Sequence, residues 1–460
     1  MPRVGEGWYD TGLSSTVKHG ILLNDTDRLV RRGPAIISRS EHNISRANIS
    51  PNALKVLYRL KNAGFEAFLV GGGVRDLLLG MHPKDFDVVT DADPDEIKQL
   101  FRNCRLIGRR FRLAHVRFGR DIVEVATFRA AGAMPDEERS HSDSGRILRD
   151  NVYGGIDEDV WRRDFTVNAL YYNIADFTVW DYTSGLDDVR ARALRLIGDP
   201  EIRYREDPVR MLRAVRFAAK LDFVLAPETE APIAELGKLL RDVPPARLFD
   251  ELLKLFHSGH AERSFDLLVQ YDLLRYLFAD TDAVLGTPKG AAMLEFIRQG
   301  LRNTDERVRA DQPVTPMFLY AVFLWFPIKE LAFKLQQEGW DEPQAVIEAS
   351  QRIVAQQQTT FPRRFSSPMK ELLAMQWRFA NHQGVRAARL LEHKRFRAAY
   401  DFLVLRSRCG EIDPATAAWW TEVQELSPAD QQQAFGVKRR QGRRRRGRRG
   451  APGPINDVAG

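Results

Sequence analysis

The chain of 460 residues, with 44% hydrophobic and 10% aromatic residues, is long enough for roughly two to four globular domains. No apolar run approaches the roughly 18 residues of a membrane span, and the N-terminus lacks the apolar core of a secretory signal. Cys104 and Cys409 have no metal-ligand spacing and are expected to be reduced thiols. We therefore expect a cytoplasmic protein with no membrane partner.

The net charge of +7 is concentrated at the end of the chain. Nine Lys or Arg residues lie between Lys438 and Arg449, and Asp457 is the only acid after Val437, so this end carries +8. The first 437 residues carry about −1. The excess charge therefore belongs to an appendage rather than to a folded domain.

In the first part of the chain, short apolar runs alternate with helical patterns, which predicts an α/β or α+β domain. The first 50 residues show no sustained periodicity, so a largely irregular extension is expected. A helix is expected at Pro51, because Ser50 is a favoured N-cap and proline fits the first helical position. The expected strands are 65–70, 86–89, 106–108, 114–118 and 122–128, the expected helices are 74–79 and 94–101, and 130–149 is expected to be a flexible loop.

After about Leu186 the pattern becomes helical with few β-branched runs, so an all-helical second half is predicted. Segments 211–221, 247–256 and 371–379 carry this periodicity most clearly. After about Ser427 the periodicity is lost, and the Arg-rich end is expected to be disordered. The predicted domains are an extension (1–50), a head (51–187), a helical neck (188–275), a helical body (276–426) and a disordered tail (427–460).

Three glycines, Gly71, Gly72 and Gly73, separate the expected strand at 65–70 from a helix. Such glycines leave backbone N–H groups free, and the helix N-terminus adds a positive dipole, so the segment suits phosphate. Dinucleotide-binding and P-loop patterns are excluded, because Asp76 stands where the last dinucleotide-motif glycine belongs and no Gly-x-x-x-x-Gly-Lys-Ser/Thr occurs. A plain structural turn is the alternative.

Asp85 and Asp87 follow shortly, two residues apart in a segment expected to be extended, so their side chains should point to the same side. Close carboxylates repel unless a cation lies between them, and oxygen ligands of this kind suit Mg²⁺. Two such ions about 3.5–4 Å apart could activate a hydroxyl and stabilise a leaving pyrophosphate. Asp-x-Asp also occurs on solvated loops, but its place after the glycines favours a metal site.

Together, Gly71–Asp76 and Asp85-Phe86-Asp87 resemble the signature of the polymerase-β-like nucleotidyltransferase superfamily. Within it, they resemble the branch of bacterial tRNA CCA-adding enzymes and poly(A) polymerases. Three further motifs occur in the same order, at Glu124–Arg129, Arg162–Ala169 and Arg205–Arg210, and the resemblance spans about 60–225. It implies an α+β fold: a catalytic head with a small mixed sheet and helices, then all-helical neck and body domains. It also implies that the triphosphate binds at Gly71, Gly72, Gly73 and Arg75.

Arg162 and Arg163 place two guanidinium groups beside the carboxylate of Asp164. Arginine binds phosphate oxygens in a forked geometry, and the carboxylate could accept from a ribose hydroxyl or help to place a metal. The resemblance implies that Asp164 joins the two earlier aspartates as a catalytic acid. Glu124, on an alternating strand, could equally complete the metal site, so we place Asp164 first and Glu124 second as its third ligand. A surface ion-pair cluster is the alternative for this motif alone.

The motif Glu206-Asp207-Pro208-Val209-Arg210 allows two interpretations. Asp207 is expected to cap a helix that begins at Pro208. Asp207 and Arg210 could also read a base, because a carboxylate accepts from an exocyclic amine and a guanidinium donates to the neighbouring ring nitrogen. Adenine and cytosine both offer this pattern, so the pair selects A or C without choosing between them. The resemblance adds Glu206 to the nucleotide site.

Other segments bear on the choice between poly(A) and CCA addition. Residues 106–116 resemble the segment that marks the bacterial poly(A) polymerases, and residues 390–402 alternate basic and aromatic side chains, as single-strand-binding surfaces do. The Arg-rich end favours sequence-independent RNA binding. The candidate RNA-binding residues are Arg109, Arg110, Arg112, Lys394, Arg395, Arg397, Arg443, Arg444, Arg445 and Arg446.

We therefore predict a polynucleotide adenylyltransferase that transfers AMP from ATP to the 3′ end of single-stranded RNA, in mRNA processing and decay. The expected cofactor is Mg²⁺, as two ions that Mn²⁺ could replace. A monomer is expected, with RNA, ATP and RNA-decay proteins as partners. One alternative is a CCA- or A-adding tRNA nucleotidyltransferase, which shares every catalytic residue. The other is a non-catalytic RNA-binding adaptor, against which the intact acids count.

Overall fold

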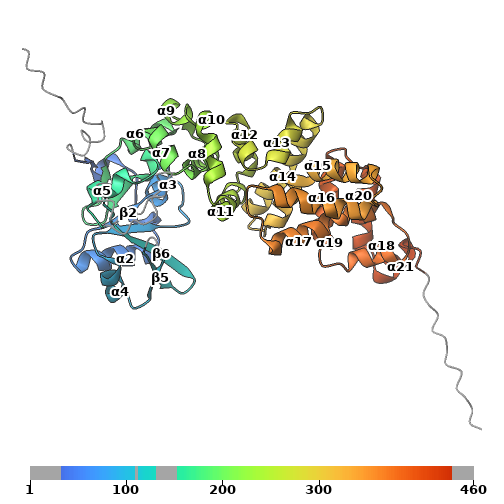
Figure 1. Ribbon diagram of the computed structural model, residues 1–460. Helices are drawn as coiled ribbons and strands as arrows, with labels where there is room; N and C mark the ends of the chain where they lie inside the picture. The colour runs from blue at the N-terminus through green and yellow to red at the C-terminus, as the bar shows by residue number, and fades with distance from the viewer. Residues whose placement is uncertain (1–32, 109–111, 131–152, 438–460) are drawn as a thin grey trace, which may run out of the picture. The chain divides into compact units, whose positions relative to one another are not determined.

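The computed structural model describes residues 33–108, 112–130 and 153–437. The chain forms two compact units, Met1–Leu236 and Gly237–Gly460, and each is described by itself (Figure 1). Arg109, Arg110, residues 443–446 and almost all of the loop expected at 130–149 lie outside the described residues. The division into head, neck, body and tail stays a prediction.

The first unit contains an eight-stranded mixed sheet in the order β1-β8-β7-β2-β3-β6-β5-β4. Its neighbouring strands pair antiparallel, except that β3 and β6 run parallel. The strands are β1 (Ala35–Ile37), β2 (Ala67–Val70), β3 (Asp87–Thr90), β4 (Cys104–Ile107), β5 (Leu113–Phe118), β6 (Asp121–Thr127), β7 (Leu170–Asn173) and β8 (Val179–Asp181). The five strands expected from the sequence are confirmed within a few residues, and so is the α+β class.

The N-terminal extension was expected to be largely irregular, and its described part contains three short regular elements. Strand β1 adds to the sheet by pairing antiparallel with β8, and short 3-10 helices follow at Arg39–Glu41 and Arg46–Asn48. A three-residue strand is too short to show a periodicity in the sequence. Its partner β8 is brought to it only by the tertiary fold.

Helix α2 (Pro51–Asn62) begins as expected: the Ser50 hydroxyl accepts from the backbone N–H groups of Asn52 and Ala53, and Pro51 is the first helical residue. Its buried residues Val56 and Leu57 belong to the side that packs on β2, β3 and β6. Helix α4 (Pro94–Leu100) packs on β4 and β5. Figure 1 shows both helices on one side of the sheet.

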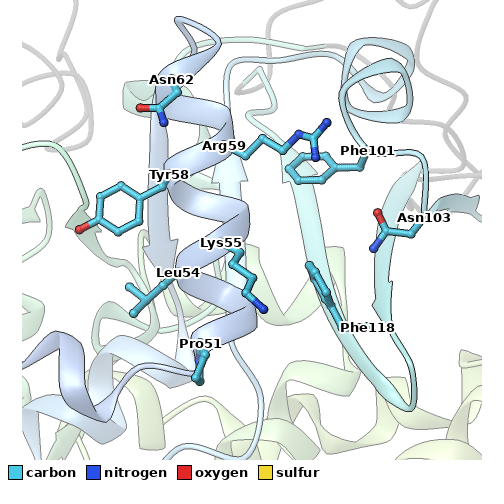
Figure 2. A pocket seen from close by; sticks show the side chains of 9 residues that line it. All are labelled: Pro51, Leu54, Lys55, Tyr58, Arg59, Asn62, Phe101, Asn103 and Phe118. Carbon is cyan, nitrogen blue, oxygen red and sulfur yellow. The ribbon is translucent and has the colours of Figure 1, made fainter.

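Figure 2 shows a groove of about 640 Å³ along α2. Lys55 lies 5.8 Å from the ring centroid of Phe118, and Arg59 lies 5.3 Å from that of Phe101.

The acidic site described below lies on the other face of the sheet. There Val89 packs with helix α5 (Ile156–Trp161) in a core cluster, and Asp87, two residues earlier on the strand, shares its face.

The rest of the first unit is mainly helical. Its helices are α3 (Gly72–Leu78), α6 (Gly185–Ala191), α7 (Pro200–Glu206), α8 (Val209–Leu221), α9 (Pro227–Glu230) and α10 (Ile233–Leu236). The prediction of an all-helical neck is wrong in one detail: β9 (Ala193–Leu194) and β10 (Val224–Leu225) form a two-stranded parallel ladder. Two residues per strand are too few to alter a helical pattern in the sequence.

The described part of the second unit is helical throughout. Its α-helices are α11 (Pro245–Phe256), α12 (Ala261–Gln270), α13 (Ala279–Leu285), α14 (Gly290–Arg309), α15 (Pro316–Gln337), α16 (Glu342–Gln356), α17 (Arg363–Ala374), α18 (Gly384–Leu391), α19 (Phe396–Arg408), α20 (Pro414–Glu425) and α21 (Pro428–Ala434). The expected disorder from 427 is wrong for α21, because Ser427 caps this helix and Phe435, just after it, is 1% exposed.

Helix α15 bears on the prediction that no apolar run approaches membrane-span length. It has 22 residues and, among the described residues, is the one helix long and apolar enough to cross a membrane. However, 67% of its most apolar window is buried inside the protein, and Phe323, Leu324 and Trp325 are 0% exposed. Burial of this kind is typical of a core helix. Pro327 and two following charges hide its length from a count of uninterrupted apolar residues.

Candidate active site

The glycines after β2 bring three predicted elements to one place. Gly71 has φ +74°, a backbone conformation that suits glycine. A Cβ atom at Gly71 would lie 3.7 Å from Oδ2 of Asp87 and 4.0 Å from Nη1 of Arg163. A Cβ atom at Gly73 would lie 3.4 Å from the carbonyl oxygen of Asp85. The predicted phosphate segment, the acidic pair and the Arg-Arg-Asp motif therefore meet here.

Asp87 is the first residue of β3, and Glu124 is its register partner on the parallel strand β6. Register partners point to the same face, so the two carboxylates lie side by side. Partial burial and the negative charges of Glu124 and Asp85 raise the pKa of Asp87 to about 6, although Arg163 opposes the shift. The cations of the protein therefore do not fully balance the negative charge of the carboxylates at this site.

Asp85 lies before β3 rather than in it, and is exposed. Glu124 also contacts its other register partner, His115 of β5, with 3.3 Å between Oε1 and Nε2. Among the described residues, no three His, Cys, Asp or Glu side chains form a ready-made metal site. Asp85, Asp87 and Glu124 are nevertheless neighbours.

Asp164 accepts hydrogen bonds from three other residues of the unit. Its Oδ2 accepts from Nε of Arg213 at 2.8 Å and also from Nη2 of the same residue. Its Oδ1 accepts from Nδ2 of Asn168 at 3.2 Å and from the N–H of Phe165 at 2.8 Å. Burial alone would raise the pKa of Asp164, but Arg213 and these hydrogen bonds hold it below its ordinary value.

Arg163 faces the glycines as expected, and two residues that the sequence analysis missed hold it there. Its Nε donates to Oη of Tyr171 at 2.7 Å, and its Nη2 donates to Oδ2 of Asp159 at 2.8 Å. The Tyr171 hydroxyl donates to the same Asp159 oxygen at 2.8 Å. Within the described structure Nη1 of Arg163 makes no hydrogen bond, which leaves it directed at the glycine segment. Arg162 precedes it, and its carbonyl accepts from Arg203 at 3.1 Å.

Arg75 is bonded to two residues of the same unit. It is 2% exposed, and its guanidinium donates to Asp76 at 2.9 Å and 2.6 Å and to Oδ1 of Asn168 at 2.5 Å. Triphosphate binding by Arg75 stays a prediction. The sequence pattern could not show the bond to Asn168, because Asn168 lies 93 residues further along the chain.

The base-reading motif lies between α7 and α8. Asp207 lies just before α8, and its Oδ1 accepts from the N–H of Val209 at 3.2 Å, as expected for a capping residue. The helix begins at Val209 rather than at Pro208. Arg210 donates to Oε2 of Glu206 at 2.9 Å and to the Arg203 carbonyl at 2.6 Å. Glu206 therefore orients the guanidinium of Arg210.

Comparison with known proteins assigns this site to a family. A family model described as the poly A polymerase head domain matches residues 67–195. Models described as a probable RNA and SrmB-binding site of polymerase A and as the polymerase A arginine-rich C-terminus match residues 222–285 and 338–451. Poly(A) polymerase I of Salmonella typhi is 50% identical over 404 residues, which cover 86% of this chain and 87% of that protein. The chain belongs to the poly(A) polymerase family.

Other matches agree with this family. Poly(A) polymerase I of Haemophilus influenzae is 45% identical over 85% of this chain and 88% of that protein. The CCA-adding enzyme of Lactobacillus helveticus is 38% identical over 48% of this chain and 53% of that protein. The solved Bacillus stearothermophilus CCA-adding enzyme in complex with CTP, 24% identical, has a TM-score of 0.55 over 84% of this chain and 83% of that one. It shares the nucleotidyltransferase fold.

As a member of the poly(A) polymerase family, the protein is a template-independent RNA nucleotidyltransferase. Enzymes of this kind use ATP and divalent metal ions. The resemblance inferred from the sequence is confirmed.

The candidate RNA-binding cations that the structure describes lie within 4 Å of acidic side chains, and the Arg395–Glu371 pair is partly buried. Arg112 donates to both carboxylate oxygens of Asp95, at 3.0 Å and 2.9 Å. Lys394 and Arg395 lie 3.9 Å and 3.6 Å from Glu371, and Arg397 lies 3.0 Å from Asp401. An exposed pair such as Arg112–Asp95 contributes little stability, so phosphate can replace the carboxylate there at small cost. RNA binding by these residues stays a prediction.

Two further arginines were missed by the sequence analysis. Arg203 lies one turn before Glu206 on α7, and Arg213 lies one turn after Arg210 on α8. Helical spacing from the recognised motif could have singled out both, because residues three or four apart share a helix face. Nothing local in the sequence indicates what they bind.

Proposed function

We propose that the protein is a polynucleotide adenylyltransferase that adds AMP from ATP to RNA 3′ ends, in poly(A) tailing and RNA decay. The observation that carries the proposal is 50% identity to a poly(A) polymerase along 86% of the chain. In contrast, the CCA-adding relative matches 48% of it. The intact acidic site argues against a non-catalytic adaptor.

Mg²⁺ fits the carboxylates of Asp85, Asp87 and Glu124, because hard oxygen ligands suit this ion and the charge at Asp87 is incompletely compensated. We assign Glu124 rather than Asp164 as the third acid, since it lies beside Asp87 in register. Two bound ions, which Mn²⁺ could replace, would favour attack of the primer 3′-hydroxyl and departure of pyrophosphate.

The other residues bind and orient the nucleotide. Gly71 and Gly73 allow the triphosphate to approach the backbone closely, and Nη1 of Arg163 faces the same place. Asp159 and Tyr171 fix that guanidinium, so little conformational entropy is lost when phosphate binds. The 3′-oxygen forms a bond to the α-phosphorus as the bond to the pyrophosphate oxygen breaks.

We assign base selection to Arg210 and Asp207, with Glu206 as the support for Arg210. Replacement of Arg210 by Ala is expected to raise KM for ATP and to reduce the preference for ATP over UTP by roughly tenfold, as loss of a charged hydrogen bond does. The measurement is kcat/KM for each nucleoside triphosphate. Unchanged selectivity would mean that the motif serves only to cap α8.

RNA is proposed to bind to basic surfaces, among them the Arg-rich end, whose +8 charge favours salt-sensitive contacts with any sequence. We also propose that the protein is a cytoplasmic monomer and that it binds RNA-decay proteins.

The direct test supplies Mg²⁺, one nucleoside triphosphate at a time, and either an unstructured RNA or a tRNA that lacks its CCA end. We expect long products on the unstructured RNA with ATP alone. Addition of a few C and A residues to the tRNA, with no reaction on the unstructured RNA, would establish the CCA-adding alternative. RNA binding with no product under any condition would establish the adaptor.

A further inference from the structure

The groove along α2 has no part in the proposed chemistry. It is lined by α2, by the segment that follows α4 and by the end of β5, on the face of the sheet opposite to Asp87 (Figure 2). We infer that this groove is a second binding site for RNA, which holds the single strand at a distance from the 3′ end that reacts. The inference rests on the proposed function, because it takes RNA as the substrate.

The first observation is the charge of the groove. Helix α2 carries Lys55, Arg59 and Lys61 and no acidic residue. Lys55 and Arg59 line the groove, and both are exposed. Within the described structure neither forms an ion pair with an acidic side chain, and Lys55 donates to Oδ1 of Asn52 at 3.4 Å. None of the side chains that line the groove is acidic. The groove therefore suits an anionic occupant.

The second observation is the spacing of the two cations. Lys55 and Arg59 are four residues apart on α2, so they share one face of the helix, with about 5–6 Å between their Cβ atoms. Successive phosphates along a nucleic-acid strand are separated by a similar distance. Each cation also has a ring beside it: Lys55 lies 5.8 Å from the ring centroid of Phe118, and Arg59 lies 5.3 Å from that of Phe101.

The third observation is that the groove offers planar surfaces on which bases can stack. Phe118 is only half-buried, so part of its ring is open. Phe101 is 3% exposed, and the exposed guanidinium of Arg59 lies over its ring, so the guanidinium plane faces outward. Bases stack both on aromatic rings and on guanidinium planes. Asn103 adds a polar group beside the rings, and its Nδ2 is fixed by the Arg117 carbonyl at 2.5 Å.

An acidic peptide is the other anionic occupant that the charge allows. Such a peptide would gain most from an aliphatic recess next to the cations. Figure 2 shows Leu54 and Tyr58 directed away from the two phenylalanines, so aromatic rings rather than aliphatic side chains accompany the cations. A nucleotide carries one charge and one planar base, and the groove repeats one cation and one ring at a spacing of one helical turn. This match favours RNA.

The direct test is a lysine footprint of the full chain, without nucleotide, in the presence of an unstructured RNA. The RNA should have about 20 nucleotides, more than the roughly 4–16 that a compact single-strand site covers. RNA should protect Lys55 from acetylation. Lys61, on the same helix but 3.5 Å from the Ala175 carbonyl, is the internal control and should react as in the free protein. Protection of Lys55 by poly-glutamate but not by RNA would identify an acidic protein partner and overturn the inference.

Variants separate the two kinds of contact. K55Q/R59Q should weaken binding of this RNA about tenfold, and the slope of log affinity against log salt should become shallower by about 1.4, since each phosphate contact contributes roughly 0.7. F118L keeps an apolar side chain without a ring, and should weaken binding about fivefold at an unchanged slope. K61Q/R190Q removes the same charge at exposed positions outside the groove and should bind as wild type.

Extension assays separate the groove from the chemistry. K55Q/R59Q should keep the wild-type kcat and KM for ATP. Its KM should rise with the long RNA but not with a trinucleotide primer, because so short a strand cannot pass from the acidic site to the opposite face of the sheet. Equal losses with both primers, or in K61Q/R190Q, would overturn the inference. If the wild type adds no AMP, the adenylation proposal fails, whereas the footprint and the affinities, measured without nucleotide, still decide on the groove.

Discussion

Replacement of Asp87 by Asn is expected to lower the turnover of AMP addition at least about a hundredfold, or about 2.7 kcal/mol of transition-state stabilisation. The asparagine side chain lacks the charge that makes Asp87 a ligand for a hard cation. It has nearly the same shape, so the backbone of β3 and the close packing of residue 87 against Gly71 are kept. RNA affinity should change little, because the charge removed is a single carboxylate at the head. The measurement is single-turnover extension at saturating ATP, together with RNA binding.

The matched control is Asp187→Asn on α6, whose carboxylate is 78% exposed and should be dispensable. Asp87→Asn should not lower the melting temperature, since it removes a negative charge beside Glu124 that the fold accommodates poorly. Inactivity is then not a folding defect. If Asp87→Asn keeps more than about a tenth of wild-type turnover, the metal assignment is wrong.

Replacement of Glu411 by Gln is expected to cost about 3 kcal/mol of stability in the second unit, since it breaks a nearly buried charge cluster. Glu411 is 13% exposed and accepts from Lys329 at 2.7 Å, from Nε1 of Trp325 at 2.8 Å and from Arg406 at 3.3 Å. Glutamine can still accept from Trp325, but Arg406, 12% exposed, loses its counter-charge. Chemical denaturation followed by tryptophan fluorescence measures the effect.

The difference between wild type and this variant should depend on pH. Burial would raise the pKa of Glu411, but Arg406, Lys329 and Trp325 outweigh it and hold the pKa below its ordinary value. The contribution is therefore complete above the unfolded-state pKa of about 4.3 and is lost as pH falls through the lower folded-state value. The two proteins should differ clearly at pH 7 and progressively less below about pH 4.

Glu422→Gln on α20 is the control, because this exposed residue has no ion pair among the described contacts and should change stability by less than about 0.5 kcal/mol. Equal stability of wild type and Glu411→Gln at pH 7 would contradict the assigned role of the cluster.

Local pattern predicted an α/β or α+β first domain, the helical second half and the start of α2, and the order of several motifs indicated the family and, with it, the α+β class. These predictions depend on features within short segments: capping at Ser50, alternation along β6, and the spacing of Asp85 and Asp87. The boundaries were less well determined where an element is short. Strands β1, β9 and β10 exist because of partners distant in the chain, and their two or three residues carry no period of their own.

The tertiary structure decided which residues surround each acid of the site. The sequence analysis placed Asp164 first and Glu124 second as the third acid, because both are carboxylates in motifs of the family. The parallel pairing of β3 and β6 places Glu124 beside Asp87, whereas Arg213 of α8 occupies Asp164. Whether a carboxylate can bind a metal depends on which donors already fill its oxygens, and those donors come from residues far away in the chain.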